Sequence, residues 1–285
     1  MTLVRSVLYM PAANERALAK AKSIPCDAII FDLEDAVAPD AKGEARHRAV
    51  AAVSSGEYGD RRLTIRCNGL TTAWGRDDLE AAATARPAAV VIPKVDSLTV
   101  LDEVAAGLDA AGAVDTSIWA MIETPTAIFD VRTLAAHPRV SALVMGTNDL
   151  ARELRVPLGV AGRTNLVPYL ATAVLAAREA GTLVVDGVFN DVRDPDGFAA
   201  ECRHGVEMGF DGKTLIHPDQ VEPANAAWTP TADDVDQARR VIAAFTAGAA
   251  EGRGVVTVDG RMIEALHVDN ARRTLAISDA IASVG

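Results

Sequence analysis

Eight short apolar runs recur along the chain, and each is followed by a longer stretch with helical periodicity. The runs are almost continuously apolar, as expected of parallel strands that are covered on both faces. We expect strands at Ser6–Met10, Ala28–Asp32, Leu63–Cys67, Ala89–Pro93, Ile118–Ile122, Ala142–Met145, Leu183–Asp186 and Gly212–Ile216. We expect helices in the intervening segments, such as Asn14–Ala21, Leu98–Ala111 and Leu166–Ala180.

Eight alternating strand–helix units within about 220 residues are typical of a (β/α)8 TIM barrel, an α/β fold. A doubly wound sheet is the alternative, but the count of units and the lack of a G-x-G-x-x-G turn favour the barrel. Asp194 and Pro195 further predict the start of one helix, and Gly209 predicts its end. We therefore predict a TIM-barrel catalytic domain over residues 1–220.

The segment after His217 has a different rhythm. We expect a helix at Ala232–Glu251, a strand-like turn in "GVVTVDGRM" and a second helix at Ile263–Ile281. A tail of roughly 65 residues is longer than the closure of a barrel requires. Residues 221–285 are therefore predicted to form a C-terminal extension that acts as a lid, as an oligomer contact, or as both.

Charge and cysteine content exclude several classes of protein. The formal net charge of −11 argues against nonspecific nucleic-acid binding, because phosphates require a basic surface. No apolar run approaches the ~18–20 residues of a membrane span, so we expect no interaction with a membrane. Cys26, Cys67 and Cys202 are dispersed and form no C-x-x-C pair, which indicates a reduced, cytoplasmic protein.

The active site of a TIM barrel lies at the carboxyl ends of its strands. In this chain those positions are rich in polar residues: Tyr9, Asp32, Glu34, Asp35, Arg66, Asn68, Lys94, Glu123, Asn148, Asp149, Asp186 and His217. Acids from neighbouring strands repel one another unless a cation lies among them. Oxygen ligands suit Mg2+, or Mn2+, better than zinc. The chain also lacks the H-E-x-x-H, G-x-S-x-G and P-loop motifs.

Position alone leaves the roles of the rim residues open. Glu123 and Asp149 could be ordinary carboxylates at helix N-termini, and Arg66 could be a solvent-facing arginine. Asp32 and Glu34 alternate along an extended strand end and share one face, whereas Asp35 points to the other. Spacing along the sequence does not distinguish these ordinary roles of Glu123, Asp149 and Arg66 from roles in binding a metal or a substrate.

Several motifs occur in a fixed order along the chain: "RSVLYMP", "AIIFDLEDAVAPDAKGEAR", "IRCNG", "VVIPKVDS", "IET", "GTNDL", "GFDGKTLIHPDQV" and "GRMIEALHVDNARR". Together they resemble the HpcH/HpaI aldolase and citrate lyase beta-subunit family over nearly the whole chain. The resemblance implies a TIM barrel that binds Mg2+ and acts on CoA thioesters of hydroxy acids. Family members cleave malyl-, citramalyl- or citryl-CoA into acetyl-CoA and a keto acid, or run the condensation.

The resemblance also implies roles for individual residues. It implies that Glu123 and Asp149 bind the metal, and that Arg66 and Glu123 contact the substrate. The implied CoA contacts are Tyr9, Arg16 and Lys20. Arg16 and Lys20 are four residues apart on one face of the first helix, which suits the phosphates of CoA.

The implied reaction needs an oxyanion-binding group and an acid. Arg66 is expected to hold the oxyanion on the thioester carbonyl as the carbon–carbon bond breaks. A carboxyl group must then protonate the methylene carbon. In many members this acid is an Asp of the tail motif that reaches over from a neighbouring subunit, whereas this chain has the longer Glu264 there. We expect Glu34 and Asp35 to hold metal-bound waters or to orient nearby cations.

Other assignments remain possible from the sequence. One is a metal-dependent aldolase that acts on free pyruvate-type keto acids, and another is a beta-like subunit that is active only in a larger lyase complex. The cations Arg16 and Lys20 favour a CoA substrate, because a free-acid aldolase needs no phosphate site. A lid exchanged between identical chains fits a closed homo-oligomer, and we expect a homotrimer or a hexamer. A binding-only protein is the last alternative, and it predicts no affinity for Mg2+.

Overall fold

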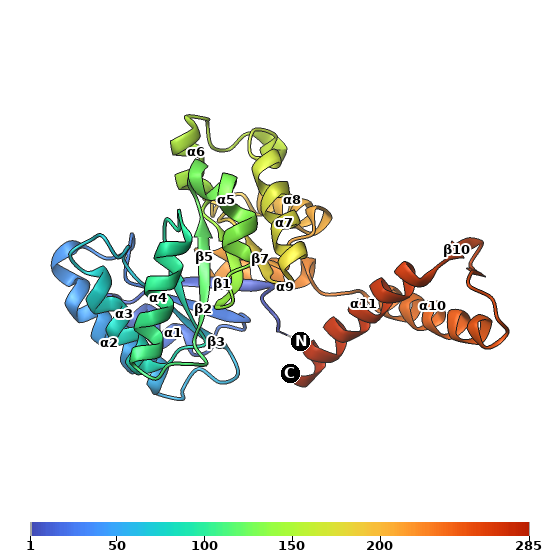
Figure 1. Ribbon diagram of the computed structural model, residues 1–285, viewed down its shortest axis with the longest axis horizontal. Coiled ribbons are helices and arrows are strands. Elements are labelled where there is room, and N and C mark those ends of the chain that lie inside the picture. The colour runs from blue at the N-terminus through green and yellow to red at the C-terminus, as the bar shows by residue number, and fades with distance from the viewer. Residues whose placement is uncertain (1, 285) are drawn as a thin grey trace. The chain divides into compact units, whose positions relative to one another are not determined.

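The computed structural model describes residues 2–284, which divide into two compact units. Residues 4–227 form the first unit, and residues 228–284 together with residues 2 and 3 form the second. Figure 1 colours the first unit from blue to light orange and the second in deeper orange and red.

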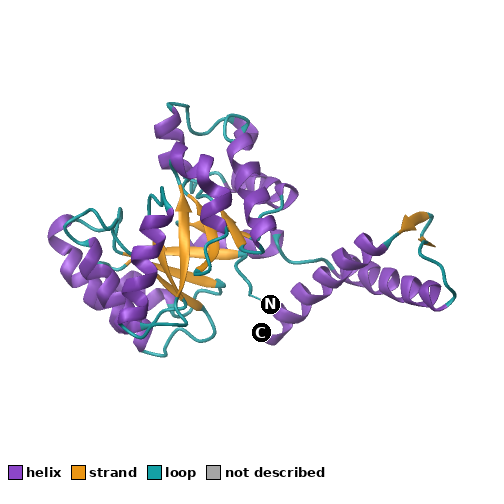
Figure 2. Ribbon diagram, viewed as in Figure 1, coloured by secondary structure: helices purple, strands orange, loops and turns teal. Residues whose placement is uncertain are grey.

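The first unit is a closed barrel of eight parallel strands in sequential order, which confirms the predicted (β/α)8 fold. The strands are β1 (Ser6–Pro11), β2 (Ala28–Asp32), β3 (Arg62–Arg66), β4 (Ala89–Ile92), β5 (Ser117–Ile122), β6 (Val140–Met145), β7 (Leu183–Asp186) and β8 (Gly212–Leu215). Because β1 pairs with both β2 and β8, the sheet has no edge. Figure 2 shows the strands at the centre of this unit with helices around them.

Helices follow the strands as the alternating pattern predicts. They are α1 (Glu15–Ala21), α2 (Lys42–Ser54), α3 (Gly75–Ala85), α4 (Leu98–Ala110), α5 (Pro125–Ala135), α6 (Thr147–Leu154), α7 (Val167–Ala180), α8 (Pro195–Met208) and α9 (Val221–Ala227). Short 3-10 helices lie at Pro39–Ala41, Ala161–Arg163 and Pro218–Gln220. The predicted boundaries of α8 are confirmed, since the Asp194 side chain accepts from the Gly197 N–H and Gly209 ends the helix in the left-handed region.

Alternate side chains of the strands fill the barrel interior. They form one buried cluster that includes Val7, Ile30, Val91, Trp119, Met121, Val144 and Val185. Side-chain direction repeats every two residues along a strand, so the next residue of the same parity reaches the rim on the same side. Tyr9, Asp32 and Glu123 arrive at the rim in this way. The same two-residue repeat therefore places apolar residues in the barrel core and polar residues at the carboxyl ends of the strands.

Closure of the barrel depends on a close approach of backbone at Gly212. A Cβ at this position would collide with the carbonyl oxygen of Val4. The absence of a side chain lets β8 lie against the segment before β1, where the Lys213 N–H donates to the Arg5 carbonyl at 3.1 Å. Any larger residue at position 212 would force the two segments apart.

The second unit has a small core of its own. It contains α10 (Ala232–Ala250), the hairpin of β9 (Val256–Val258) and β10 (Arg261–Ile263), and α11 (Ala265–Val284). The hairpin turns at Asp259 and Gly260, which both have positive φ, as a two-residue turn of the mirror-image type requires. The core residues are Ala238, Val241, Val256, Val258, Ile263, Val268 and Ala271. The two predicted helices are present, and the second begins at Ala265 because Ile263 ends β10.

Among residues 2–284, none of the helices combines the length and apolar character needed to cross a membrane. The three cysteines are all buried, and none forms a disulfide.

Candidate active site

Arg66 lies at the centre of the rim, at the end of β3. Its Nε and Nη2 donate to the two carboxylate oxygens of Asp32, each at 2.6 Å, and Nη1 lies 2.7 Å from Glu34 Oε2. Asp35 is a weaker partner at 3.4 Å, and 67 % of its side chain is exposed. Burial opposes the charge of Arg66, but Asp32, Tyr9 and Glu34 together outweigh it and raise the pKa of the guanidinium. Arg66 is therefore a fixed cation on the cavity wall.

Asp32 was expected at the rim, but the sequence assigned it no specific role. The register of β2 and β3 pairs it directly with Arg66, and its carboxylate also accepts from the backbone N–H groups of Glu34 and Ala36. Both residues lie near the ends of predicted strands, but only the register between β2 and β3 shows that they meet. Glu34 and Asp35 were expected to orient nearby cations, and both lie beside Arg66.

The loop after β2 is held by a buried network that sequence reasoning missed. The Lys42 ammonium donates to the carbonyl oxygens of Leu33 and Glu34 and to Asn68 Oδ1. Asn68 in turn donates to Asp78 Oδ2 at 2.6 Å and to the carbonyl oxygen of Leu33 at 2.8 Å. These bonds fix the backbone from which Glu34 projects.

Tyr9 packs its ring against the Arg66 guanidinium, whose central carbon lies 4.8 Å from the ring centroid. Burial raises the pKa of the Tyr9 phenol, so it stays protonated. Tyr9 lines the rim cavity, which has a volume of about 360 Å³.

Of the other residues predicted to contact CoA, Arg16 lines a separate open hollow of about 570 Å³, and Lys20 lies one turn further along α1. Both cations are exposed, and neither forms an ion pair within residues 2–284.

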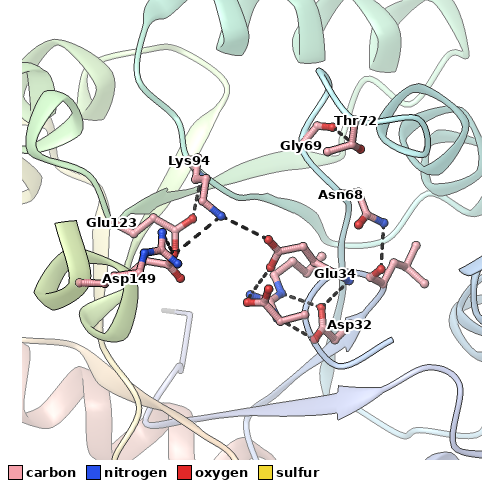
Figure 3. Close-up of polar contacts among 12 residues, drawn as sticks. Asp32, Glu34, Asn68, Gly69, Thr72, Lys94, Glu123 and Asp149 are labelled. Carbon is pink, nitrogen blue, oxygen red and sulfur yellow. Dashed lines mark hydrogen bonds and ion pairs between the residues drawn. The ribbon is translucent and has the colours of Figure 1, made fainter. Parts of the chain in front are cut away.

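Glu123 and Asp149 face the cavity from β5 and α6 (Figure 3). Glu123 is only 2 % exposed, and its Oε1 accepts from the backbone N–H of Lys94 at 2.7 Å. Burial raises the pKa of Glu123 to about 7. The hydrogen bond from the Lys94 N–H opposes this rise, and the charge of Asp149 adds to it. A Cβ at Gly146 would collide with the Glu123 carboxylate, so only glycine allows β6 to approach it this closely.

Asp149 carries a buried oxygen atom that no hydrogen-bond donor satisfies. Its Oδ1 lies 2.6 Å from Arg152 Nη2 and 3.8 Å from Lys94 Nζ, so its charge has partners, but the geometry is not that of a hydrogen bond. Within residues 2–284 there is no group of three acidic, histidine or cysteine side chains that would enclose a metal. Asp149 has an oxygen without a hydrogen bond, and Glu123 has a pKa raised by burial and by the Asp149 charge. A bound Mg2+ would relieve both. Two carboxylates suffice for this ion, because it usually keeps several of its waters.

Lys94 links the two halves of the rim, although the sequence analysis assigned it no role. Its Nζ lies 3.6 Å from Glu34 Oε1 and 3.8 Å from Asp149 Oδ1. Partial burial opposes the charge, but Glu34, Glu123 and Asp149 together raise the pKa of the ammonium. Lys94 is therefore charged, and it stands between the Arg66 cluster and the Glu123–Asp149 pair (Figure 3).

Asp186 was expected at the rim but belongs to a different cluster. Val185 points into the barrel, so the following residue points outward between β7 and α8. There Asp186 contacts Arg163 Nη1 at 2.7 Å and Lys213 Nζ at 3.1 Å, and Glu201 completes the set at 2.7 Å from Lys213. All charges in this buried group are paired, which indicates a structural role.

Glu264 lies in the second unit, between β10 and α11. It is half-buried, and its backbone N–H donates to His267 Nδ1 at 3.0 Å. Its carboxylate forms no hydrogen bond or ion pair with any residue that the structure describes. Its role as an acid that acts across a subunit boundary stays a prediction.

Comparison with known proteins identifies relatives over the whole chain. The family model described as HpcH/HpaI aldolase/citrate lyase matches residues 5–218. A (3S)-malyl-CoA thioesterase of Cereibacter sphaeroides is 47 % identical over 281 residues, which cover 99 % of this chain and 96 % of the relative. The citrate lyase subunit beta of Escherichia coli K12 is 36 % identical over 282 residues, and the match covers 95 % of this chain and 92 % of the relative.

A solved structure is similar over the same span. The CitE protein of Mycobacterium tuberculosis in complex with magnesium, acetoacetate and coenzyme A superposes with a TM-score of 0.80 at 28 % identity. The match covers 96 % of this chain and 97 % of that one.

Proposed function

The chain belongs to the HpcH/HpaI aldolase/citrate lyase family, and we propose that it is a Mg2+-dependent carbon–carbon lyase. Its substrate would be a 3-hydroxyacyl-CoA thioester, which it cleaves to acetyl-CoA and a 2-keto acid or forms by the reverse condensation. The observation that carries the proposal is the Glu123–Asp149 pair, which shares one cavity with the Arg66 cation.

In this proposal Glu123 and Asp149 hold the metal ion. When bound, Mg2+ supplies Lewis acidity that lowers the cost of removing the proton from the substrate hydroxyl. Arg66 binds the oxyanion that develops on the thioester carbonyl. Asp32 keeps the guanidinium in place through two short bonds, so little reorganisation is needed as charge develops.

The CoA portion has a path that leads to this cavity. Arg16 and Lys20 offer two unpaired cations for its phosphates. The hollow beside Arg16 shares Pro11 and Ala36 with the rim cavity, so the pantetheine arm could pass between them. The similar CitE structure contains magnesium and coenzyme A, which supports the proposal that this chain binds Mg2+ and a CoA thioester. A CoA path also favours this function over an aldolase for free keto acids.

The charges of the cavity rank the candidate substrates. Its wall includes four carboxylates and one cation, which are Asp32, Asp35, Glu123, Asp149 and Arg66. A second free carboxylate, as in citryl-CoA, would lie among these four carboxylates and would compete with them for the two nearby cations, Arg66 and Lys94. Met121, Met145, Val188 and Ile216 instead offer an apolar surface to a hydrogen or methyl substituent. We therefore place malyl- and citramalyl-CoA ahead of citryl-CoA.

Glu264 is proposed as the acid that protonates the methylene carbon, supplied by a neighbouring subunit of a homotrimer or hexamer. This role makes the second unit a lid and an oligomer contact. We also propose a cytoplasmic location, because the three cysteines are unpaired and buried.

A second candidate is hydrolysis of the thioester, because relatives with 47–48 % identity are named (3S)-malyl-CoA thioesterases. This reaction would use the same metal and oxyanion groups but would release free CoA and leave the hydroxy acid intact.

A mass-spectrometric assay with malyl-, citramalyl- and citryl-CoA, in Mg2+ and in EDTA, tests these proposals. Metal-dependent release of acetyl-CoA and a keto acid would support the lyase, and release of free CoA would support the hydrolase. Turnover that survives in EDTA would contradict the metal role. No turnover of any thioester, with Mg2+ still bound, would favour a free keto acid or a beta-like subunit that requires its complex.

A further inference from the structure

Lys94 has an unusual backbone conformation. Its φ of 48° lies in the left-handed region, which residues other than glycine rarely adopt. In this conformation its N–H donates to Glu123 Oε1 at 2.7 Å. Glycine would satisfy the same backbone geometry with less strain, so the backbone alone does not explain a lysine at this position.

The side chain of Lys94 extends into the gap between Glu34 and Asp149 (Figure 3). The ammonium lies 3.6 Å from one carboxylate and 3.8 Å from the other. Both distances are too long for a good hydrogen bond, so the ammonium is attracted by charge but not locked in place. The side chain is 45 % exposed and can therefore meet an incoming ligand.

A divalent cation at Glu123 and Asp149 would change this balance. It would take up the buried Oδ1 of Asp149, which forms no hydrogen bond of good geometry although Arg152 Nη2 lies 2.6 Å away. The ammonium would then lose Asp149, one of the two carboxylates with which it forms ion pairs, and would be repelled by the metal. Only Glu34 would remain, and Arg66 already binds that carboxylate at 2.7 Å.

We propose that Lys94 is a further substrate-binding residue of this site, which together with Arg152 balances the charge of Asp149 in the free protein and binds an anionic oxygen of the substrate once the metal is bound. The inference rests on the proposed metal-dependent function. It adds a second cation to Arg66 and explains why the strained position carries a lysine.

Calorimetric titration separates these roles without turnover. Mg2+ is titrated into metal-free protein at pH 8.5, and glyoxylate and pyruvate are then titrated at saturating Mg2+. Lys94→Gln and Lys94→Gly should each bind Mg2+ about tenfold more tightly, because a repelling charge has been removed. Both should bind the keto acid at least about tenfold more weakly, and Lys94→Arg should restore most of this loss.

Two controls keep the result specific. Lys94→Gly retains the N–H donor to Glu123 and relieves the strain, so its thermal midpoint should equal or exceed that of Lys94→Gln. Lys22→Gln removes a surface ammonium that is paired with Glu57, and it should leave both affinities unchanged.

The outcomes distinguish this inference from the function on which it rests. Unchanged or weaker Mg2+ binding in the two neutral variants, or undiminished keto-acid binding, would overturn the role of Lys94 alone. A wild-type protein that binds no Mg2+ would overturn the proposed function and this inference with it.

Discussion

The barrel and the C-terminal unit differ in how they hold their candidate catalytic groups. In the barrel, Arg66 is fixed by Asp32 and Glu34, and Glu123 by a backbone N–H. In the C-terminal unit, Glu264 has a carboxylate without a partner in the described chain. The barrel therefore contains a preorganised site, whereas the second unit presents a carboxylate that no described side chain holds in place.

The two regions also differ in how they are packed. The barrel closes eight strands around a continuous core, and its rim charges are part of that packing. The second unit packs two helices against a short hairpin through small side chains. Changes at the barrel rim should therefore affect both activity and stability, and changes at Glu264 should affect activity alone.

The largest effect is expected from Arg66→Met. Loss of the cation leaves Asp32 and Glu34 without their main partner, and removing one side of a buried ion pair costs about 3–5 kcal/mol of unfolding free energy. Turnover should fall by about 10³-fold, because the oxyanion loses its donor. Denaturant unfolding and steady-state kinetics measure the two effects. Arg132→Met, which breaks an exposed pair with Glu179, should cost at most about 1 kcal/mol.

The next largest effect concerns Glu123. The stability of the wild-type protein should depend on pH through this residue, and Glu123→Gln should remove that dependence. Burial raises the pKa of Glu123 to about 7 from 4.5, so the folded metal-free protein binds this proton more tightly than the unfolded chain does. The wild type should therefore lose stability relative to the variant as pH rises from 4.5 to 8, by up to about 3 kcal/mol.

Thermal unfolding in EDTA at several pH values tests this expectation. Saturating Mg2+ should abolish the difference in the wild type, because a metal stabilises the ionised carboxylate. A constant gap between the two proteins across the pH range would mean that Glu123 does not titrate there.

Glu264→Gln should reduce turnover by about 100-fold, because a carboxamide cannot deliver the proton. The thermal midpoint should not change, since the carboxylate has no partner to lose. Glu251→Gln is a matched control in the same unit, where Glu251 pairs with the nearby Arg253. A marked loss of stability in Glu264→Gln would place this residue in a structural role and would remove the contrast between the two regions.

The smallest effect is expected from Val241→Ala, in the core of the second unit. Val241 is buried, and removing its methyl groups should cost about 1–2 kcal/mol. Hydrogen exchange should show faster exchange in residues 232–284 and unchanged protection in the barrel strands. Faster exchange in both regions would show that the two units unfold together.

Local sequence patterns determined the architecture of this protein. Eight apolar runs predicted the strands, and Asp194 and Gly209 predicted the ends of α8, because these signals depend on neighbouring residues only. Their positions at the carboxyl ends of predicted strands also placed Arg66 and Glu123 at the rim. The order of the motifs identified the family, which the comparisons confirm.

The tertiary structure decided which rim residues meet. The Asp32–Arg66 bond depends on the register between two strands, and the role of Asp186 depends on the side of β7 from which it projects. The left-handed backbone of Lys94 has no signature in residue type. These features depend on distances between segments far apart in the chain and on backbone angles imposed by closure of the barrel. Spacing along the sequence does not contain that information.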